Sequence, residues 1–382
     1  MRILVIKLSS IGDIVHALPA VALLRRSLPT AQISWVVDGA GSSLLEGSPT
    51  IDRLINLGLG AFSKRPASPE ARREFFAALA EMRRGRQSEC ANGNGGAEAK
   101  GPPDVVIDFQ GLIKSGIIAS ATGSRNRVGC EDADLRERPS KVFLTGQVQT
   151  SHCSHIIDKN IALAQSVVER LNGASAEGVD TRAREYEFPI AVSDQDETYI
   201  DSVLEPGARF AILNPGGGWK TKLWPAENFS RIGDWLWAEC GIKSVVTFGP
   251  GEEPLARAVV SASRSDKVRS VPSTLKQYVA LARRAALFVG GDTGPLHLAA
   301  ASRTPIVGLY GPTAPERNGP FDPSDITVGR DLWCRTDCHR RKCWHWECMD
   351  IPVAEVQRAI QLRLERSSVQ QPSTQRPYSR IV

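Results

Sequence analysis

Three glycine-rich segments carry the side chains of this chain that are best suited to chemistry. The first, Ser9-Ser10-Ile11-Gly12-Asp13, follows an apolar run at the amino terminus. Gly12 permits a tight turn or the close approach of a ligand. Asp13 is placed either to cap a helix or, where its carboxylate faces a ligand, to act as a general base. The segment by itself favours the capping role and leaves the general base open.

The second segment runs from Asn214 to Pro225 and combines the glycines at 216–218 with Lys220 and Lys222. Glycines bare their backbone N–H groups for an anion, and lysine adds positive charge. Neither the Walker pattern nor a G-x-G-x-x-G after the first strand of either half is present, so nothing supports a dinucleotide dehydrogenase or a P-loop enzyme. Phosphate binding is favoured over an ordinary glycine-rich loop with solvated lysines.

The third segment is Asp292-Thr293-Gly294, which follows two further glycines and leads into a helix with Pro295 in its first turn. The N–H groups at a helix start form an anion site, and His297 lies about one turn further on. A ligand contact and a packed core position are equally consistent with this histidine. An aspartic protease is excluded, because that class is all-β and needs two carboxylates sharing one site.

Four of the eight cysteines, Cys334, Cys338, Cys343 and Cys348, lie close together in the sequence. Four thiols are enough for a tetrahedral zinc site, but the spacing is not the paired C-x2-C of zinc ribbons. Disulfides are not expected in a reducing cytoplasm. A structural or reduced-thiol role is therefore favoured, with structural zinc as the alternative.

The elements that must position these residues are short β-branched runs, each next to a segment of helical period. Strands are predicted at 3–6, 33–37, 54–57 and 105–109, and again at 210–213, 244–248, 287–290 and 306–310. Strands that alternate with helices predict parallel βαβ units with both sheet faces covered. The expected fold class is α/β, with two doubly wound Rossmann-like domains facing a cleft, where the carboxyl ends of the strands bind ligands.

The domain boundary is expected at a polar region near residue 189. The first domain, 1–188, includes an insertion at 84–103 that is rich in Gly, Asn and Ala and is expected to be disordered. The second domain, 189–366, includes the cysteine cluster at 334–348. A tail at 367–382, rich in Ser, Gln, Pro and Arg, is also expected to be disordered.

The composition is that of an ordinary globular protein. The chain has 382 residues, a net charge of +5 and 42% hydrophobic residues, which excludes a collagen, a wholly disordered chain and a disulfide-dense miniprotein. The mild charge, with both signs interspersed, argues against a dedicated DNA-binding protein. No apolar stretch is long enough to span a bilayer. Because Lys7 and Asp13 interrupt the apolar amino terminus, no signal peptide is expected either.

Together the motifs resemble glycosyltransferase family 9, the heptosyltransferases that build the inner core of lipopolysaccharide. The matching segments are 5–13, 108–115, 222–225, 291–297 and 310–313, in a resemblance that extends from residue 1 to about residue 360. The resemblance implies the glycosyltransferase B fold and an inverting, metal-independent transfer of heptose from ADP-heptose to Kdo-lipid A. It implies no cofactor, no nucleic-acid partner, and a cytoplasmic protein, peripheral at the inner face of the inner membrane, that touches the membrane surface transiently.

The resemblance also implies a role for particular residues. Asp13 is similar to the base that deprotonates the acceptor hydroxyl, and Lys222 to the cation that stabilises the diphosphate leaving group. Lys114 and Arg136 match the acceptor side. The implied donor-binding residues are Ser10, Gly12, Gly217, Gly218, Glu252, Asp292, Thr293, Gly294 and His297.

Two of these assignments are open within the family pattern. Either Glu252 or Glu253 matches the family carboxylate near the nucleotide ribose. Gly217 and Gly218 stand where the first heptosyltransferase of the pathway has hydroxyl side chains that contact phosphate, and their backbone N–H groups would have to substitute.

Two other functions remain in view. One keeps the fold and changes the nucleotide sugar or the acceptor. The other is a non-catalytic protein that binds nucleic acid or a surface through the Cys/Arg/Trp segment at 334–348. This second alternative ranks behind, because it leaves the three glycine-rich segments without a purpose.

Overall fold

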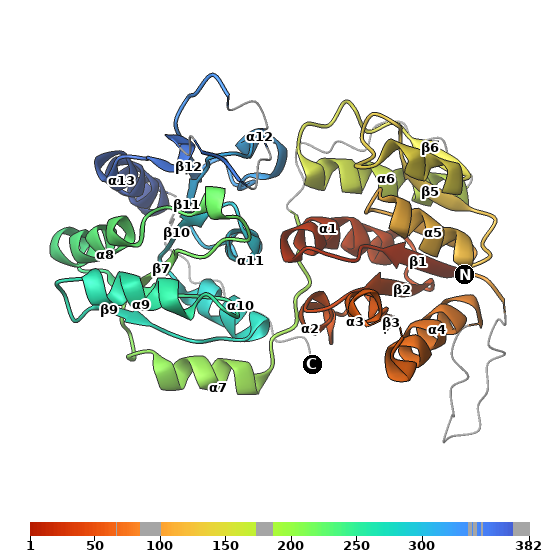
Figure 1. Cartoon of the computed structure of the whole chain (residues 1–382), viewed down its shortest axis with the longest axis horizontal. Coiled ribbons are helices and arrows are strands. Elements are labelled where there is room, and N and C mark those ends of the chain that lie inside the picture. The colour runs from red at the N-terminus through yellow and green to blue at the C-terminus, as the bar shows by residue number, and fades with distance from the viewer. Residues whose placement is uncertain are drawn as a thin grey trace. The chain divides into compact units, whose positions relative to one another are not determined.

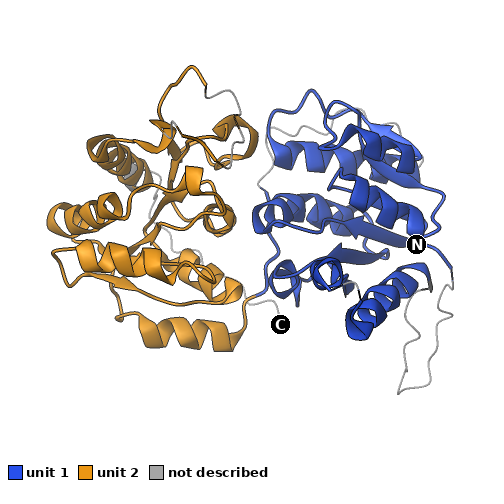
Figure 2. Ribbon diagram, in the orientation of Figure 1, with its two compact units in different colours: residues 1–191 blue, residues 192–382 orange. Residues whose placement is uncertain are grey.

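The computed structural model describes residues 1–65, 67–84, 101–172, 186–334, 338, 342–344 and 347–369. The chain divides into two compact units, residues 1–191 and 192–382 (Figure 2). The observed division falls three residues after the predicted one, at 191/192 in place of 188/189. Most of the predicted insertion at 84–103 and of the predicted tail lies outside the described residues. The last helix, however, continues to Val369, into the segment predicted as a tail.

Unit 1 is a parallel sheet of order β3-β2-β1-β4-β5-β6 (Figure 1). Its strands are β1 (Arg2–Ile6), β2 (Gln32–Val37), β3 (Arg53–Asn56), β4 (Val105–Asp108), β5 (Arg127–Cys130) and β6 (Gly146–Val148). Its helices are α1 (Ile11–Ser27), α2 (Gly41–Leu45), α3 (Leu59–Lys64), α4 (Pro69–Arg84), α5 (Ile113–Ala121), the 3-10 helix η1 (Arg138–Phe143) and α6 (Ile156–Asn172).

Unit 2 repeats the plan with the sheet order β12-β11-β10-β7-β8-β9. Its strands are β7 (Phe210–Asn214), β8 (Lys243–Val246), β9 (Val268–Ser270), β10 (Leu287–Gly291), β11 (Ile306–Leu309) and β12 (Ile326–Val328). Its helices are α7 (Asp194–Val203), η3 (Lys220–Lys222), α8 (Ala226–Cys240), α9 (Glu253–Ala262), α10 (Leu275–Arg284), α11 (Gly294–Ala301), α12 (Pro315–Asn318), η4 (Glu347–Met349) and α13 (Val353–Val369).

Every predicted strand is present within a residue or two, and the α/β fold class is confirmed. The sequence pattern missed β5, β6, β9 and β12, which are three or four residues long and lie at or next to a sheet edge. Central strands such as β4 and β10 are buried along their whole length. They therefore read as continuous apolar runs, whereas the short outer strands do not.

The strand register places the glycine-rich segments. In unit 1, Ile6 at the end of β1 pairs with Asp108 at the end of β4, so the loops that follow these two strands lie at one sheet edge. In unit 2, Asn214 of β7 pairs with Gly290 of β10, which brings the segments after residues 214 and 291 to one edge as well. Loops after parallel strands are where such sheets bind ligands.

Candidate functional site

Asp13 lies in the first turn of α1, where the loop after β1 turns into the helix. The backbone N–H of Ser10, the residue before the helix, donates to Asp13 Oδ2 at 3.0 Å, and the Ser10 hydroxyl approaches the same oxygen at 3.3 Å. The capping role weighed from the sequence is therefore real. Gly12 is buried beside it in the same turn.

The carboxylate of Asp13 also faces two cations. Arg136 donates to both of its oxygens, at 3.1 and 2.7 Å, and Lys7 Nζ lies 3.8 Å from Oδ1. Burial by itself would raise the pKa of Asp13, but the charges of Lys7 and Arg136 and the Ser10 N–H outweigh it and hold the pKa below its usual value. Asp13 is thus ionised at neutral pH, as a carboxylate that accepts a proton must be.

Lys7 is a member of this group that the sequence analysis did not single out. Its side chain is buried, its Nζ donates to the Phe109 carbonyl at 2.7 Å, and burial lowers its pKa. A lysine at the end of an otherwise apolar strand was the available signal, since a lysine is almost never fully buried without a partner. Lys7 therefore links Asp13 to the end of β4.

The loop after β4 is held by a second buried carboxylate, Asp108. Its oxygens accept hydrogen bonds from Gln110 N–H at 2.9 Å, Gly111 N–H at 3.2 Å and the Ser115 hydroxyl at 2.8 Å. Gly111 has φ of +65°, a conformation that favours glycine. Burial raises the pKa of Asp108. This loop sets the start of α5, where Lys114 is exposed on the first turn.

In unit 2 the corresponding group centres on Asp292, directly after β10. Lys222 Nζ donates to Asp292 Oδ2 at 2.6 Å and to its backbone carbonyl at 2.9 Å. His297 Nε2 lies 3.1 Å from Asp292 Oδ1, and Asn318 Nδ2 donates to the same oxygen at 3.0 Å. His297 is therefore both buried and in contact with the group, and Asn318 is a member that sequence reasoning missed.

Charge balance at Asp292 favours its ionised form. Burial would raise the pKa of this carboxyl, but the contacts with His297 and Lys222 lower it far below its usual range. Thr293 precedes α11 as its cap position, and Gly294 is the first residue of the helix. A helix start and an ammonium group therefore lie next to each other, which is the charge arrangement that receives a phosphate.

The glycine segment 216–218 packs against Glu252. The Glu252 carboxylate accepts from Gly217 N–H at 2.9 Å and from Gly249 N–H at 2.8 Å. A Cβ at Gly216 would stand 2.2 Å from Glu252 Oε2, so any larger residue there would displace the Glu252 carboxylate. Glu252, rather than the exposed Glu253, faces the loop. The Gly217 N–H, expected to face phosphate, is thus already bonded, whereas a Cβ at Gly218 would meet nothing within 4 Å.

Two further polar atoms at this sheet edge are buried and have no hydrogen-bond partner in the part of the chain that the structure describes. They are Asn214 Oδ1, at the end of β7, and Thr313 Oγ1, in the segment after β11. Leu309, the last residue of β11, pairs with Gly291, so that segment borders Asp292. Buried polar atoms usually have a hydrogen-bond partner, and a bound ligand would supply one here.

The four clustered cysteines are partly exposed. Burial raises the pKa of the Cys348 thiol, and the three other cysteines of the cluster add to that shift. Among the residues with described positions, no group of three or more His, Cys, Asp or Glu side chains is placed to hold a metal ion. The two histidines of the cluster, at 339 and 345, lie outside those residues.

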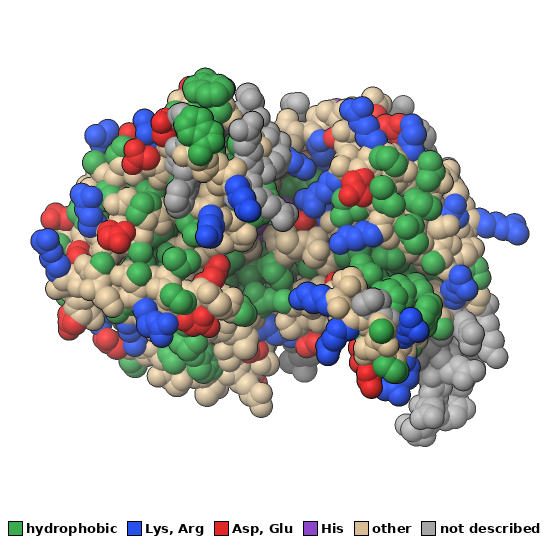
Figure 3. Space-filling view, viewed as in Figure 1, with side chains coloured by type: hydrophobic (Ala, Val, Ile, Leu, Met, Phe, Trp, Pro, Cys, Tyr) green, Lys and Arg blue, Asp and Glu red, His purple; other side chains and the backbone are tan. Residues whose placement is uncertain are grey.

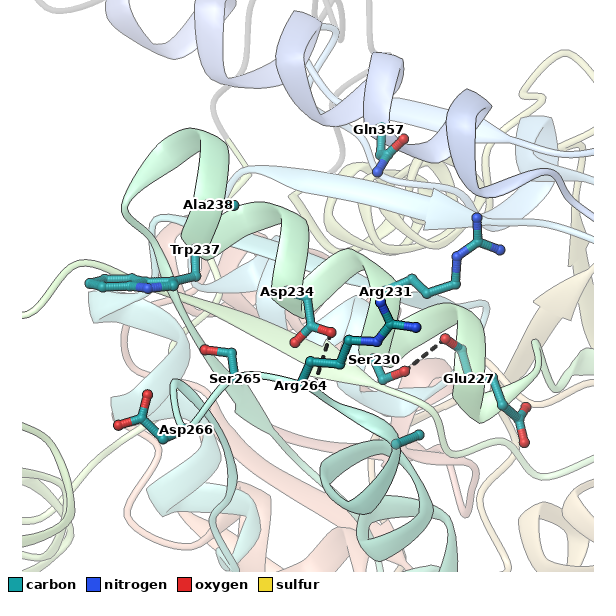
Figure 4. Close-up of a pocket in the computed structure, with 11 residues that line it drawn as sticks. Glu227, Ser230, Arg231, Asp234, Trp237, Ala238, Arg264, Ser265, Asp266 and Gln357 are labelled. Atoms are coloured by element: carbon teal, nitrogen blue, oxygen red, sulfur yellow. Dashed lines mark hydrogen bonds between the residues drawn. The ribbon is translucent and has the colours of Figure 1, made fainter.

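A separate hollow on unit 2, with a volume of about 940 Å³, lies between α8, the end of α9 and α13 (Figure 4). Charges of both signs line it: Arg231 and Arg264 face it together with Asp234, which accepts from Arg264 N–H at 3.1 Å. None of the site residues predicted from the sequence lines this hollow.

Comparisons with known proteins agree with the motif reading. Residues 101–345 match the family model described as glycosyltransferase family 9 (heptosyltransferase). Lipopolysaccharide heptosyltransferase 1 of Pseudomonas aeruginosa is 26% identical over 372 residues, which cover 96% of this chain and 92% of that protein.

Two solved structures of one enzyme show the same fold. The E. coli heptosyltransferase WaaC with ADP matches with a TM-score of 0.70 at 22% identity, covering 95% of this chain and 100% of that one. Its structure with ADP-2-deoxy-2-fluoro heptose matches with a TM-score of 0.68 at 21% identity, covering 96% and 100%. The expected glycosyltransferase B fold, with two doubly wound sheets, is confirmed.

Proposed function

Because the chain belongs to glycosyltransferase family 9, we propose that it transfers a heptose from ADP-heptose to the Kdo-lipid A inner core of lipopolysaccharide. The transfer inverts the anomeric configuration and uses no metal ion. The name of the P. aeruginosa relative and the nucleotide ligands named with the E. coli structures support the acceptor class and the donor.

The observation that carries the proposal is the Lys222–Asp292 pair at the start of α11. Lys222 Nζ is held at 2.6 Å from Asp292 Oδ2, in a site whose side chains are only 14% and 3% exposed. Departure of ADP develops negative charge on the diphosphate, and a fixed ammonium beside the helix-start N–H groups meets that charge without reorganisation. Lys222 and the α11 start therefore supply the stabilisation that a divalent ion supplies elsewhere.

Asp13 serves the acceptor. Its ionised carboxylate accepts the proton of the acceptor hydroxyl while the oxygen forms a bond to the anomeric carbon of the heptose. The bond between that carbon and the diphosphate breaks, and ADP leaves with the electron pair. This is a single displacement with one carboxylate as base, so the configuration inverts.

Arg136 and Lys114 serve the acceptor's acidic groups. Arg136 is 41% exposed while it contacts Asp13, so part of its side chain is open to solvent. Guanidinium groups bind carboxylates and phosphates in a two-pronged geometry, which suits an acceptor that carries Kdo carboxylates and lipid A phosphates.

Incubation with ADP-heptose and Kdo-lipid A tests the proposal. We expect stoichiometric ADP release and an acceptor whose mass increases by one heptose unit. A parallel panel of other nucleotide sugars and of heptosylated acceptors identifies a different donor or core position. Absence of transfer with every pair in the panel refutes the proposed reaction.

We place the protein in the cytoplasm, in transient contact with the inner face of the inner membrane, because its proposed acceptor is a lipid. No helix among the described residues is long and apolar enough to cross a membrane. Fractionation of cells that express the chain tests the proposed contact by the distribution of the protein between supernatant and membranes.

A further inference from the structure

Unit 1 exposes a set of large apolar side chains that the proposed reaction does not use. They are Phe76 on α4, Ile113 and Ile117 on α5, and Val142 on η1, with exposed fractions of 59%, 38%, 51% and 72%. We call this surface the α4–α5–η1 face. Leaving apolar side chains of this size in water is unfavourable, and covering them would gain free energy.

The four side chains sit on one packed assembly. Ile113 and Ile117 are four residues apart on α5 and so lie on the same side of that helix. η1 packs tightly on α5, because a Cβ added at Gly116 would stand 2.7 Å from the Phe143 ring. The side chain of Arg83, near the end of α4, donates to the Ala121 carbonyl at the end of α5.

Phe76 is held outward by the aromatic residues beneath it. The rings of Phe62 and Phe75 stack with centroids 4.5 Å apart, and Phe76 meets both edge-on, at 6.4 and 5.6 Å. Phe62 and Phe75 are partly buried, whereas Phe76 is exposed. Phe76 is therefore the outermost ring of a three-ring cluster.

Basic side chains surround the apolar ones. Arg72 and Arg73 lie one turn before Phe76 on α4, Lys114 lies between the two isoleucines of α5, and Arg138 and Lys141 flank Val142 on η1; all five are exposed. Among the nearby acidic side chains, Asp132 pairs with Lys141, Glu137 accepts from Ile113 N–H at 2.8 Å, and the exposed Glu70 at the start of α4 accepts from the Ser68 hydroxyl at 2.7 Å. Glu74 on α4 is exposed. Figure 3 shows hydrophobic side chains among Lys and Arg over α4 and α5.

The face adjoins the acceptor base through shared backbone. The Glu137 N–H donates to the Gly111 carbonyl at 3.0 Å, and a Cβ at Gly111 would stand 3.4 Å from the Arg136 nitrogen. Arg136, which contacts Asp13, thus lies just before the start of η1 and against the loop that starts α5. A surface that docks on α5 and η1 therefore lies beside the acceptor site.

We propose that the α4–α5–η1 face docks on an anionic lipid bilayer. Exposed apolar side chains separated by cations suit the interface of a membrane. There the apolar side chains enter the boundary between headgroups and acyl chains, and Lys and Arg contact the anionic headgroups. A protein partner would instead call for a continuous apolar centre depleted of charge. Only the role of this docking rests on the proposed function: it would present a lipid-linked acceptor to Asp13.

Vesicle co-sedimentation of the full chain tests the docking without any substrate. We expect binding to phosphatidylglycerol/phosphatidylcholine vesicles that is at least tenfold tighter than to pure phosphatidylcholine and that weakens as salt rises. Phe76→Glu and Val142→Glu each weaken binding about tenfold. The matched control is Leu362→Glu, which places the same charge at a side chain on α13 of unit 2 that is 44% exposed and leaves binding unchanged.

Two results overturn the proposal: equal binding to both kinds of vesicle, or equal losses for Phe76→Glu and Leu362→Glu. Thermal unfolding of each variant verifies the fold. Turnover provides the second readout, because Phe76→Glu should slow transfer to a vesicle-embedded acceptor while transfer to a delipidated, water-soluble one stays unchanged. If neither acceptor is used by the unmodified chain, the proposed reaction fails while the vesicle result still decides the docking.

Discussion

Replacing Lys222 by Met separates its electrostatic role from its structural one. The substitution keeps most of the side-chain volume and removes the ammonium that lies 2.6 Å from Asp292 Oδ2. If the ammonium stabilises the departing diphosphate, kcat falls by about 10²–10³-fold, the loss typical for removal of one preorganised group that stabilises developing charge. The exposed neighbour Lys220, two residues away on η3, provides the matched control, Lys220→Met.

The same substitution also changes stability, by an amount that the burial of the pair sets. Asp292 is 3% exposed and would lose its nearest cation. Breaking a buried pair costs about 3–5 kcal/mol, and the remaining contacts with His297 and Asn318 place the loss at the low end. For a unit of this size, a loss of about 3 kcal/mol lowers Tm by roughly 6–12 °C.

The double variant Lys222→Met/Asp292→Asn decides between the two roles. Neutralising Asp292 removes the unpaired buried charge, so Tm should recover most of its loss, while kcat, measured as ADP release under saturating donor, stays low. A kcat of Lys222→Met within threefold of that of Lys220→Met would refute the electrostatic role. Recovery of kcat together with Tm would show that Lys222 acts only by holding the fold.

Three further outcomes are expected. Asp13→Asn should lower kcat by about 10²–10⁴-fold and should also lower Tm, because the buried Lys7 loses its counter-charge; near-normal ADP release, measured well below that Tm, would remove this residue as the base. Glu252→Ala should weaken ADP affinity measured by calorimetry, because the bonds to Gly217 and Gly249 N–H that order the loop are lost; unchanged affinity would contradict that role. Burial raises the pKa of Asp325 to about 6, above its unfolded value of about 3.9. Its contribution to the free energy of unfolding is then greatest below pH 4 and declines by roughly 2–3 kcal/mol as pH rises to 6. Asp325→Asn should abolish this decline in urea unfolding measured across that pH range. A decline that persisted in the variant would contradict the assignment to Asp325.

Much of the fold could be predicted from the order of the residues, because the information is local. A buried parallel strand needs an unbroken apolar run, and the runs at β1, β4, β7 and β10 are such segments. A helix start is favoured by a capping residue, and Ser10 and Thr293 stand at the cap positions of α1 and α11. The short outer strands carry too few apolar residues to be recognised in this way.

The composition of the two charged groups was decided only by the tertiary structure. Lys7 and Asp13 lie close together in the sequence, but Arg136 comes from a segment far along the chain, and no spacing pattern links it to Asp13. They meet because β1 pairs with β4 in a register that brings the loops after both strands to one edge. Arg136 then lies against the loop after β4.

The same holds at the nucleotide side of the proposal. Lys220 and Lys222 look alike in the sequence, as do Glu252 and Glu253. The single turn of η3 directs Lys222 to Asp292, and the start of α9 directs Glu252 into the glycine loop while Glu253 stays exposed. Residue type and local pattern determined which chemistry the chain can carry. Which of two similar neighbours faces the site depends on the direction of its side chain. Strand register and the phase of the helix set that direction, and they depend on residues far away in the sequence.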